Sequence, residues 1–270
     1  MMGCCDLLAD GMPVTLGSDH TPVGLKTQRL RTVEDVRILL TRVQQQRATV
    51  ARRLVGDVAG STRSHTALIL TLRQLDASSG KYCKSTFDCV ELAGVQRPDK
   101  SGVERLTAVD ALVMATDGRN PAGGQSAVTN YELSMLRTQL VRNEFGSVRD
   151  RQLVPPVVDY LISLLVGKRK SLVSAVICLS SASQNGWESW FSCTCGHDFS
   201  RVSTSLVPEK SHDAAKYATE IAKRATEAEQ KMRDTPEDGP GSKFYLLRRA
   251  TAQDLRNEAN IFRQLLQAAV

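Results

Sequence analysis

The sequence Ser-Thr-Arg-Ser-His occupies residues 61–65, and Glu-Leu-Ala-Gly follows at residues 91–94. Between these two motifs, the side-chain pattern predicts strands over residues 66–75 and 85–92. The turn-forming sequence Ser-Ser-Gly lies within residues 76–81, which join the two strands. Strands joined by so short a turn pair antiparallel, so the pattern predicts an antiparallel pair within a mixed sheet.

Helical periodicity surrounds this strand pair. The helices predicted from apolar spacing and terminal residues cover residues 32–53, 103–116, 131–143, 155–166, 187–201, 214–232 and 250–269. A continuous apolar run at 172–179 predicts a buried central strand, and Gly and Pro residues predict breaks at 117–125 and 234–242. We therefore predict an α/β fold, with a mixed central sheet flanked by helices over residues 1–207 and a C-terminal helical tail over residues 208–270.

The composition is that of an ordinary globular protein and narrows the class of partner. Of the 270 residues, 41% are hydrophobic and 24% are charged, and 35 basic against 29 acidic residues give a net charge of +6. This excess fits an acidic macromolecular partner, whereas an aromatic content of 5% disfavours a surface that stacks nucleic-acid bases. Seven cysteines without a regular spacing, and no apolar stretch of spanning length, predict reduced thiols in a cytoplasmic protein without a membrane span.

The two motifs resemble the nucleotide-sensing switches of the kinesin motor domain, which read Ser-Ser-Arg-Ser-His and Asp-Leu-Ala-Gly. The order and rough spacing of further segments agree with that family from Gly24 to about Val202. The resemblance implies part of a P-loop NTPase motor fold over residues 1–207. It also implies that the tail over residues 208–270 serves as a neck or coiled coil, a candidate for homodimerisation through the C-terminal helices.

The resemblance assigns nucleotide and metal roles to three residues. Ser61 and Ser64 would contact the phosphates of ATP, and Ser64 with Glu91 would hold Mg²⁺. From the residues alone, the serines are equally compatible with turn hydroxyls, and Glu91 with a surface charge at the end of a strand.

The resemblance also implies a set of catalytic residues. In the family, Gly94 would meet the γ-phosphate, while Arg63 would pair with the residue at position 96 and latch the two switches together. That position is Gln96 in this chain, which can accept a hydrogen bond from Arg63 but cannot form the family's ion pair. The implied catalytic residues are Arg63, Glu91, Gly94 and Gln96.

The family's partner is the microtubule, which implies a place in the cytoskeleton. The basic residues that we expect to contact tubulin are Lys100, Arg105, Arg149 and Arg151. These contacts would be electrostatic and therefore sensitive to salt.

No Gly-x-x-x-x-Gly-Lys-Ser/Thr sequence occurs in the 270 residues. The resemblance thus implies a microtubule motor that hydrolyses ATP in the complete family form, and we expect this chain to be impaired or inactive as an ATPase. The alternative is a non-catalytic microtubule-binding or interaction protein derived from a motor domain, and a third reading is an unrelated α/β domain. An in-frame P-loop upstream of Met1 in the gene would favour the motor.

Overall fold

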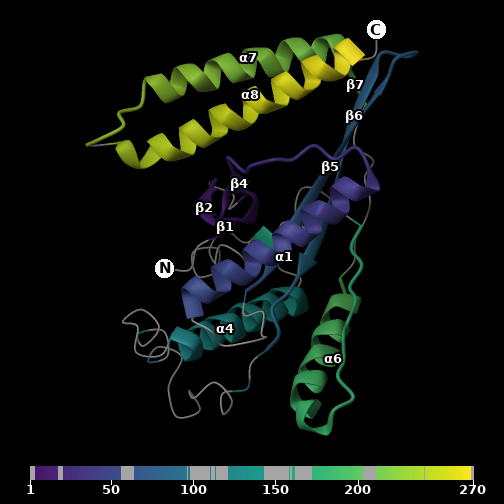
Figure 1. Cartoon of the computed structure of the whole chain (residues 1–270), viewed down its shortest axis with the longest axis vertical. Helices are drawn as coiled ribbons and strands as arrows, with labels where there is room; N and C mark the ends of the chain where they lie inside the picture. Colours follow the sequence, from purple (N-terminus) through teal and green to yellow (C-terminus); the bar gives the residue numbers. More distant parts are fainter. Residues whose placement is uncertain are drawn as a thin grey trace. The chain divides into compact units, whose positions relative to one another are not determined.

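The computed structural model describes residues 4–17, 21–55, 64–95, 97, 110, 113, 121–142, 158, 160–161, 172–202, 211–239 and 241–268. These residues form a mixed α/β structure with five α-helices and small antiparallel sheets (Figure 1). The chain divides into two compact units. One contains Ala48–Leu68 and Asp88–Val207, and the other contains Met2–Arg47, Ile69–Phe87 and Pro208–Val270.

The strands are short except for one pair. They are β1 (Cys5–Asp6), β2 (Met12–Pro13), β3 (Thr15–Leu16), β4 (Pro22–Val23), β5 (Thr66–Asp76), β6 (Lys81–Glu91) and β7 (His212–Asp213). The α-helices are α1 (Val33–Val55), α4 (Pro121–Arg142), α6 (Gly186–Ser200), α7 (Ala214–Arg233) and α8 (Tyr245–Ala268). Single 3₁₀ turns occur at Leu7–Ala9, Ser183–Asn185 and Ser242–Phe244.

Strands β5 and β6 confirm the predicted antiparallel pair. They are neighbours in one sheet, and only residues 77–80 connect them, so the pair is a hairpin. β6 begins four residues before the predicted start, so the turn between the two strands is shorter than predicted. The short strand β7 extends the sheet by pairing antiparallel with the start of β6, where Lys81 lies opposite Asp213 and Tyr82 opposite His212.

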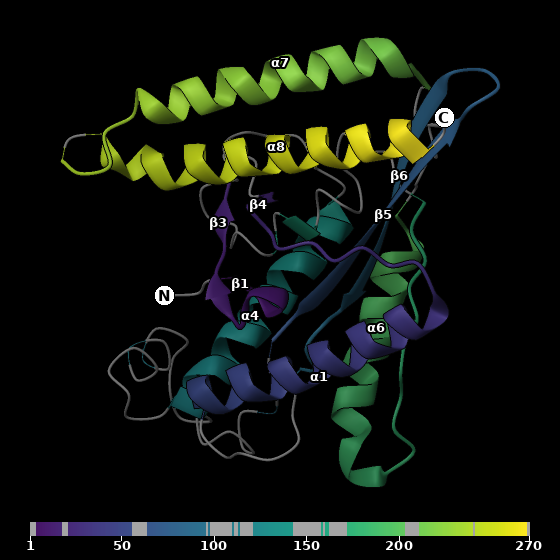
Figure 2. The same ribbon diagram turned by 45° about the horizontal axis from the view of Figure 1, so that its top comes forward.

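Helices α7 and α8 confirm the helices predicted at residues 214–232 and 250–269, and they form an antiparallel hairpin of their own. They lie side by side in both views (Figure 1 and Figure 2). The Asp213 side chain caps α7 by accepting a hydrogen bond from the Lys216 N–H at 3.0 Å. The apolar side of α7, which includes the buried Ile221 and Ala225, packs within the chain.

The unit that contains α8 has an aromatic core. Tyr82 from β6, Tyr217 from α7 and Phe262 from α8 meet with ring centroids 4.7–5.0 Å apart. Tyr82 and Phe262 are almost completely buried. Aromatic side chains bury large apolar areas, so this cluster holds the two helices against the strands.

Gly24 lies unusually close to α8 in the same unit. Its φ is +73°, and a Cβ at this position would come within 2.9 Å of the Ala250 Cβ. Its N–H donates to the Asp254 carboxylate at 2.8 Å. A side chain here would be strained and would push the segment away from the helix.

The Glu258 carboxylate of α8 gathers donors from two strands and a helix. Arg73 donates from both Nε and Nη2, and the Lys84 ammonium lies 3.5 Å from Oε1. The hydroxyls of Tyr82 and Tyr217 donate to the same oxygen, at 3.4 and 3.2 Å. Since the Glu258 side chain is only 11% exposed, these donors replace the water that the carboxylate loses on folding.

The other unit is built around α4. Leu136 and Leu140 from this helix pack with Val158 and Leu161, and Val90 and Leu92 lie against the same cluster. An ion pair joins α4 to α6, with the Arg137 Nε 2.7 Å from a carboxylate oxygen of the buried Asp198. The helix prediction for residues 187–201 is confirmed by α6.

Two predictions about this unit are wrong. The predicted central strand at 172–179 is not paired with any described residue, and most of its side chains are exposed. An apolar run becomes a central strand only when neighbouring strands satisfy its backbone, and β5 and β6 do not flank it. The predicted break at 117–125 is also wrong from Pro121 onward, because proline is tolerated at the first position of a helix and the packing of α4 outweighs the low propensity of its glycines.

Several predictions are left untested. The predicted helices at 103–116 and 155–166 fall almost entirely outside the described residues, although Val158 and Leu161 are helical and buried. The division at residue 208 also stays a prediction. No helix among the described residues has the length and apolarity needed to cross a bilayer.

We predict that Glu258→Gln lowers the free energy of unfolding at about pH 7 by about 2–3 kcal/mol, because Arg73 and Lys84 lose their shared counter-charge. Burial alone would raise the pKa of Glu258, but the hydrogen bond from Arg73 and the charge of Lys84 outweigh burial and lower this pKa. The stabilisation is therefore present above the ordinary value of 4.5 and is lost as the pH falls through the lowered pKa. Urea titrations of both proteins across this range test the prediction.

The exposed Glu237→Gln is the matched control, and we expect it to change stability by less than about 0.5 kcal/mol. If Glu258→Gln were as mild as this control, or kept the acid dependence of the wild type, the carboxylate network would not stabilise the unit.

Candidate functional site

The two motifs meet at the open end of the β5–β6 hairpin. His65 immediately precedes β5, and residues 92–94 immediately follow β6. The Ala93 N–H donates to Nδ1 of His65 at 3.0 Å, and Ala93 is itself buried. A single side chain thus ties the end of one motif to the backbone of the other.

Helix α4 contributes an acid to this junction. Nε2 of His65 lies 3.4 Å from a carboxylate oxygen of Glu132, and the two side chains are only 6% and 8% exposed. This is an ion-pair distance, although Nε2 makes no well-formed hydrogen bond. Because Nδ1 accepts a hydrogen bond, a neutral His65 carries its proton on Nε2, which faces the carboxylate.

We call His65, Ala93 and Glu132 the motif junction. Within it, the His65 imidazole accepts a hydrogen bond from the Ala93 N–H and directs its own N–H toward Glu132 of α4. This arrangement fixes the relative position of the motifs and leaves a buried acid beside a titratable base. It can hold two loops together.

The predicted site residues that the structure describes surround this junction. Ser64 precedes His65, Glu91 ends β6, and Gly94 follows Ala93; all three are exposed. The remaining predicted site residues lie outside the described residues: Ser61, Arg63, Gln96, Lys100, Arg105, Arg149 and Arg151. The Arg63–Gln96 latch therefore stays a prediction.

The described residues hold no group of three or more His, Cys, Asp and Glu side chains placed to bind a metal ion. The pair proposed for Mg²⁺, Ser64 and Glu91, supplies one hydroxyl and one carboxylate. Mg²⁺ keeps several waters and is usually bound through one or two carboxylates together with substrate phosphates. Magnesium binding here therefore depends on a bound nucleotide and stays a prediction.

Neither His65 nor Glu132 is among the predicted site residues, although His65 lies within the first motif. One signal was available for Glu132. Val128, Glu132, Leu136 and Leu140 recur every four residues, and all four are buried. An acid in an apolar stripe needs a buried partner, and a donor such as a histidine N–H satisfies that need.

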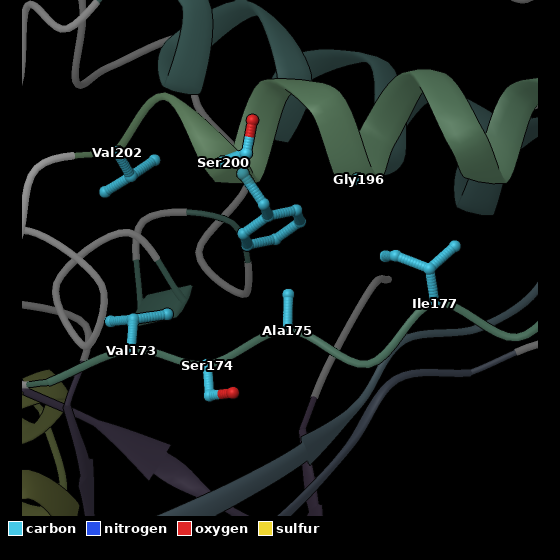
Figure 3. A pocket seen from close by; sticks show the side chains of 8 residues that line it. Val173, Ser174, Ala175, Ile177, Gly196, Ser200 and Val202 are labelled. Atoms are coloured by element: carbon cyan, nitrogen blue, oxygen red, sulfur yellow. The ribbon is translucent and has the colours of Figure 1, made fainter.

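A separate cavity of about 330 Å³ lies between residues 173–177 and α6 (Figure 3). The described side chains around it are apolar or hydroxylic, and none is charged; they are Val173, Ser174, Ala175, Ile177, Phe199, Ser200 and Val202, together with Gly196. Its serine hydroxyls have no acid or base beside them in this lining, and a hydroxyl needs an adjacent base to act as a nucleophile. The motif junction is the better candidate for a functional site.

No protein-family model, curated protein or solved structure matches the chain. The likeness to the kinesin motor domain therefore depends on the two motifs, their spacing and the segments around them.

We predict that His65→Ala lowers the free energy of unfolding by about 2 kcal/mol, because the substitution leaves the buried Ala93 N–H without an acceptor and removes the N–H that faces Glu132. His65→Asn keeps an acceptor oxygen near the position of Nδ1, so we expect it to recover part of this loss. Urea unfolding of the three proteins gives the comparison.

His197→Ala is the control for histidine removal, because the His197 side chain is 68% exposed. We expect a change below about 0.5 kcal/mol for this variant. Equal effects at His65 and His197 would show that the junction contributes nothing.

Proposed function

We propose that this chain is a kinesin-related, microtubule-binding protein of the cytoskeleton, and that these 270 residues do not hydrolyse ATP. One observation carries most weight in favour of a shared origin. The segments that resemble the two switches are tied together through the hydrogen bond from the Ala93 N–H to His65. The β5–β6 hairpin brings both segments to one end of the strand pair, and the two switches of the family also lie at one edge of its sheet.

The lack of hydrolysis follows from the chemistry of nucleotide binding. Most of the affinity of a P-loop site comes from backbone N–H groups and a lysine that surround the phosphates. These 270 residues contain no such sequence. Ser64 and Glu91 can assist a bound Mg·ATP, but they cannot replace the groups that hold it.

The junction also favours a fixed arrangement over a nucleotide-driven switch. His65 and Glu132 are both buried, and separating the motifs would break the Ala93 hydrogen bond and expose an acid–histidine pair. A motor needs switch segments that move when the γ-phosphate leaves. In this chain we infer that the segments serve to hold the surface that faces the microtubule.

The motor itself is the second candidate function. In that case, a P-loop encoded upstream would complete the site, with Arg63, Glu91, Gly94 and Gln96 taking the catalytic roles. Sequencing of the transcript upstream of Met1 separates the two candidates.

We predict that calorimetric titration of the chain with Mg·ATP gives no binding with a Kd below about 100 μM. The physical reason is the missing phosphate cradle. An ATPase with an intact P-loop, titrated in the same buffer, is the positive control. Saturable binding in the low micromolar range would contradict the proposal that this chain is not an ATPase.

We predict that the chain cosediments with microtubules at low salt and is released as salt rises, since exposed charges are screened within about 10 Å at 0.1 M salt. Reversal of four charges, by Lys100→Glu, Arg105→Glu, Arg149→Glu and Arg151→Glu, should abolish cosedimentation.

Arg249→Glu and Arg263→Glu, on the exposed side of α8, are the control for a change in overall charge. We expect this pair to retain most of the binding. Equal loss in both sets of variants, or binding that is indifferent to salt, would show that the predicted surface does not recognise the microtubule.

A further inference from the structure

Residues 172–180 are an extended, unpaired stretch with the side-chain pattern of a strand. Val173, Ala175 and Ile177 point toward α6, whereas Ser174 points away from it (Figure 3). This alternation has the period of two that β-strands show. The segment therefore has strand geometry without strand partners.

One face of the segment lies against α6. Ile177 packs against Gly196 of α6 so closely that a Cβ on this glycine would lie 2.8 Å from the isoleucine side chain. The opposite face is open, since Leu172 is 74% exposed and Val176 is 87% exposed. Helix α6 thus supports the segment from one side only.

The backbone edges of the segment are also open. Across the described part of the chain, no residue makes a hydrogen bond to the main-chain N–H or C=O groups of residues 172–179. The first such bonds occur at Ser180, whose N–H and C=O both bond the Ser189 hydroxyl, at 3.3 and 3.1 Å. Eight consecutive residues therefore offer unused donors and acceptors.

The segment lacks the features that keep natural strand edges apart. No Lys, Arg, Asp, Glu or Pro occurs between residues 171 and 182. An apolar, uncharged edge is a template for pairing with another chain, and main-chain hydrogen bonds supply the affinity of such pairing. We propose that residues 172–179 pair antiparallel with the same residues of a second copy of this chain.

A second copy fits the segment because the stretch is uncharged and close to self-complementary. If both α6 helices cover the same side of the new two-stranded sheet, residues of the same parity must lie opposite each other. The register that uses the whole stretch places Val176 opposite itself. Ala175 then faces Ile177 and Leu172 faces Ser180, so a small side chain meets a large one in these two pairs, whereas Val173 faces Leu179.

The C-terminal helices are a weaker route to a dimer. The apolar side of α7 already packs within the chain, as Ile221 and Ala225 are buried. The strand-like segment is the part of the described surface that combines apolar side chains with unused backbone groups.

The proposal is tested by the oligomeric state of the full chain, measured by sedimentation velocity over a range of micromolar concentrations. We expect a monomer–dimer equilibrium for the wild type. Val176→Lys places two like charges opposite each other at the two-fold axis and should weaken the dimer at least about tenfold. Val176→Thr, which stays β-branched and uncharged, is the matched control and should keep the wild-type affinity.

A cysteine variant supplies a second readout that does not depend on loss of association. Facing residues of an antiparallel pair have Cα atoms 4.5–5.5 Å apart, within the range of a disulfide. Val176→Cys should therefore give an oxidised dimer whose linked peptides join position 176 to position 176. A monomeric wild type at all concentrations, a dimer indifferent to Val176→Lys, or crosslinks confined to the native cysteines would each overturn the proposal.

Discussion

The pairing of β5 with β6 is the constraint on which the motif junction and the hydrogen bonds to Glu258 both depend. Because the two strands are equal in length and joined by residues 77–80, their register brings Thr66 and Glu91 to the same end. That end carries the motif junction. Further along the same strands, Arg73 and Tyr82 reach the carboxylate of Glu258. A shift of the pairing register by one residue would turn each of these side chains to the other face of the sheet. The contacts at the motif junction and at Glu258 would then be lost.

The two buried acids are stabilised in different ways, and the difference bears on their use. Glu258 receives hydrogen bonds from an arginine and two tyrosines, so its charge is fully compensated and its pKa is lowered. Glu132 faces one histidine nitrogen at 3.4 Å without a well-formed hydrogen bond. The carboxylate of Glu258 therefore stabilises the fold through several hydrogen bonds, whereas the contact of Glu132 with His65 is a single ion-pair distance.

Local sequence signals recovered the elements whose cause is local. The hairpin, α6 and the two C-terminal helices follow from side-chain alternation and helical spacing, so these elements could be predicted, with bounds that differ by a few residues. The long-range features could not be. The contact between Glu132 and His65 and the hydrogen bonds to Glu258 cannot be predicted from any single segment. Each joins residues far apart in the sequence, which only tertiary packing brings together.

The error at residues 172–179 shows the limit of reading a strand from its own residues. An apolar run reports that the segment is suited to burial, but the hydrogen bonds that make a strand belong equally to its neighbours. Residues 172–179 show the side-chain alternation of a strand, but they lack the hydrogen bonds to neighbouring strands that complete a sheet. The hydrogen bonds that a central strand makes are therefore still available to this segment, and pairing with a second copy of this chain would supply them.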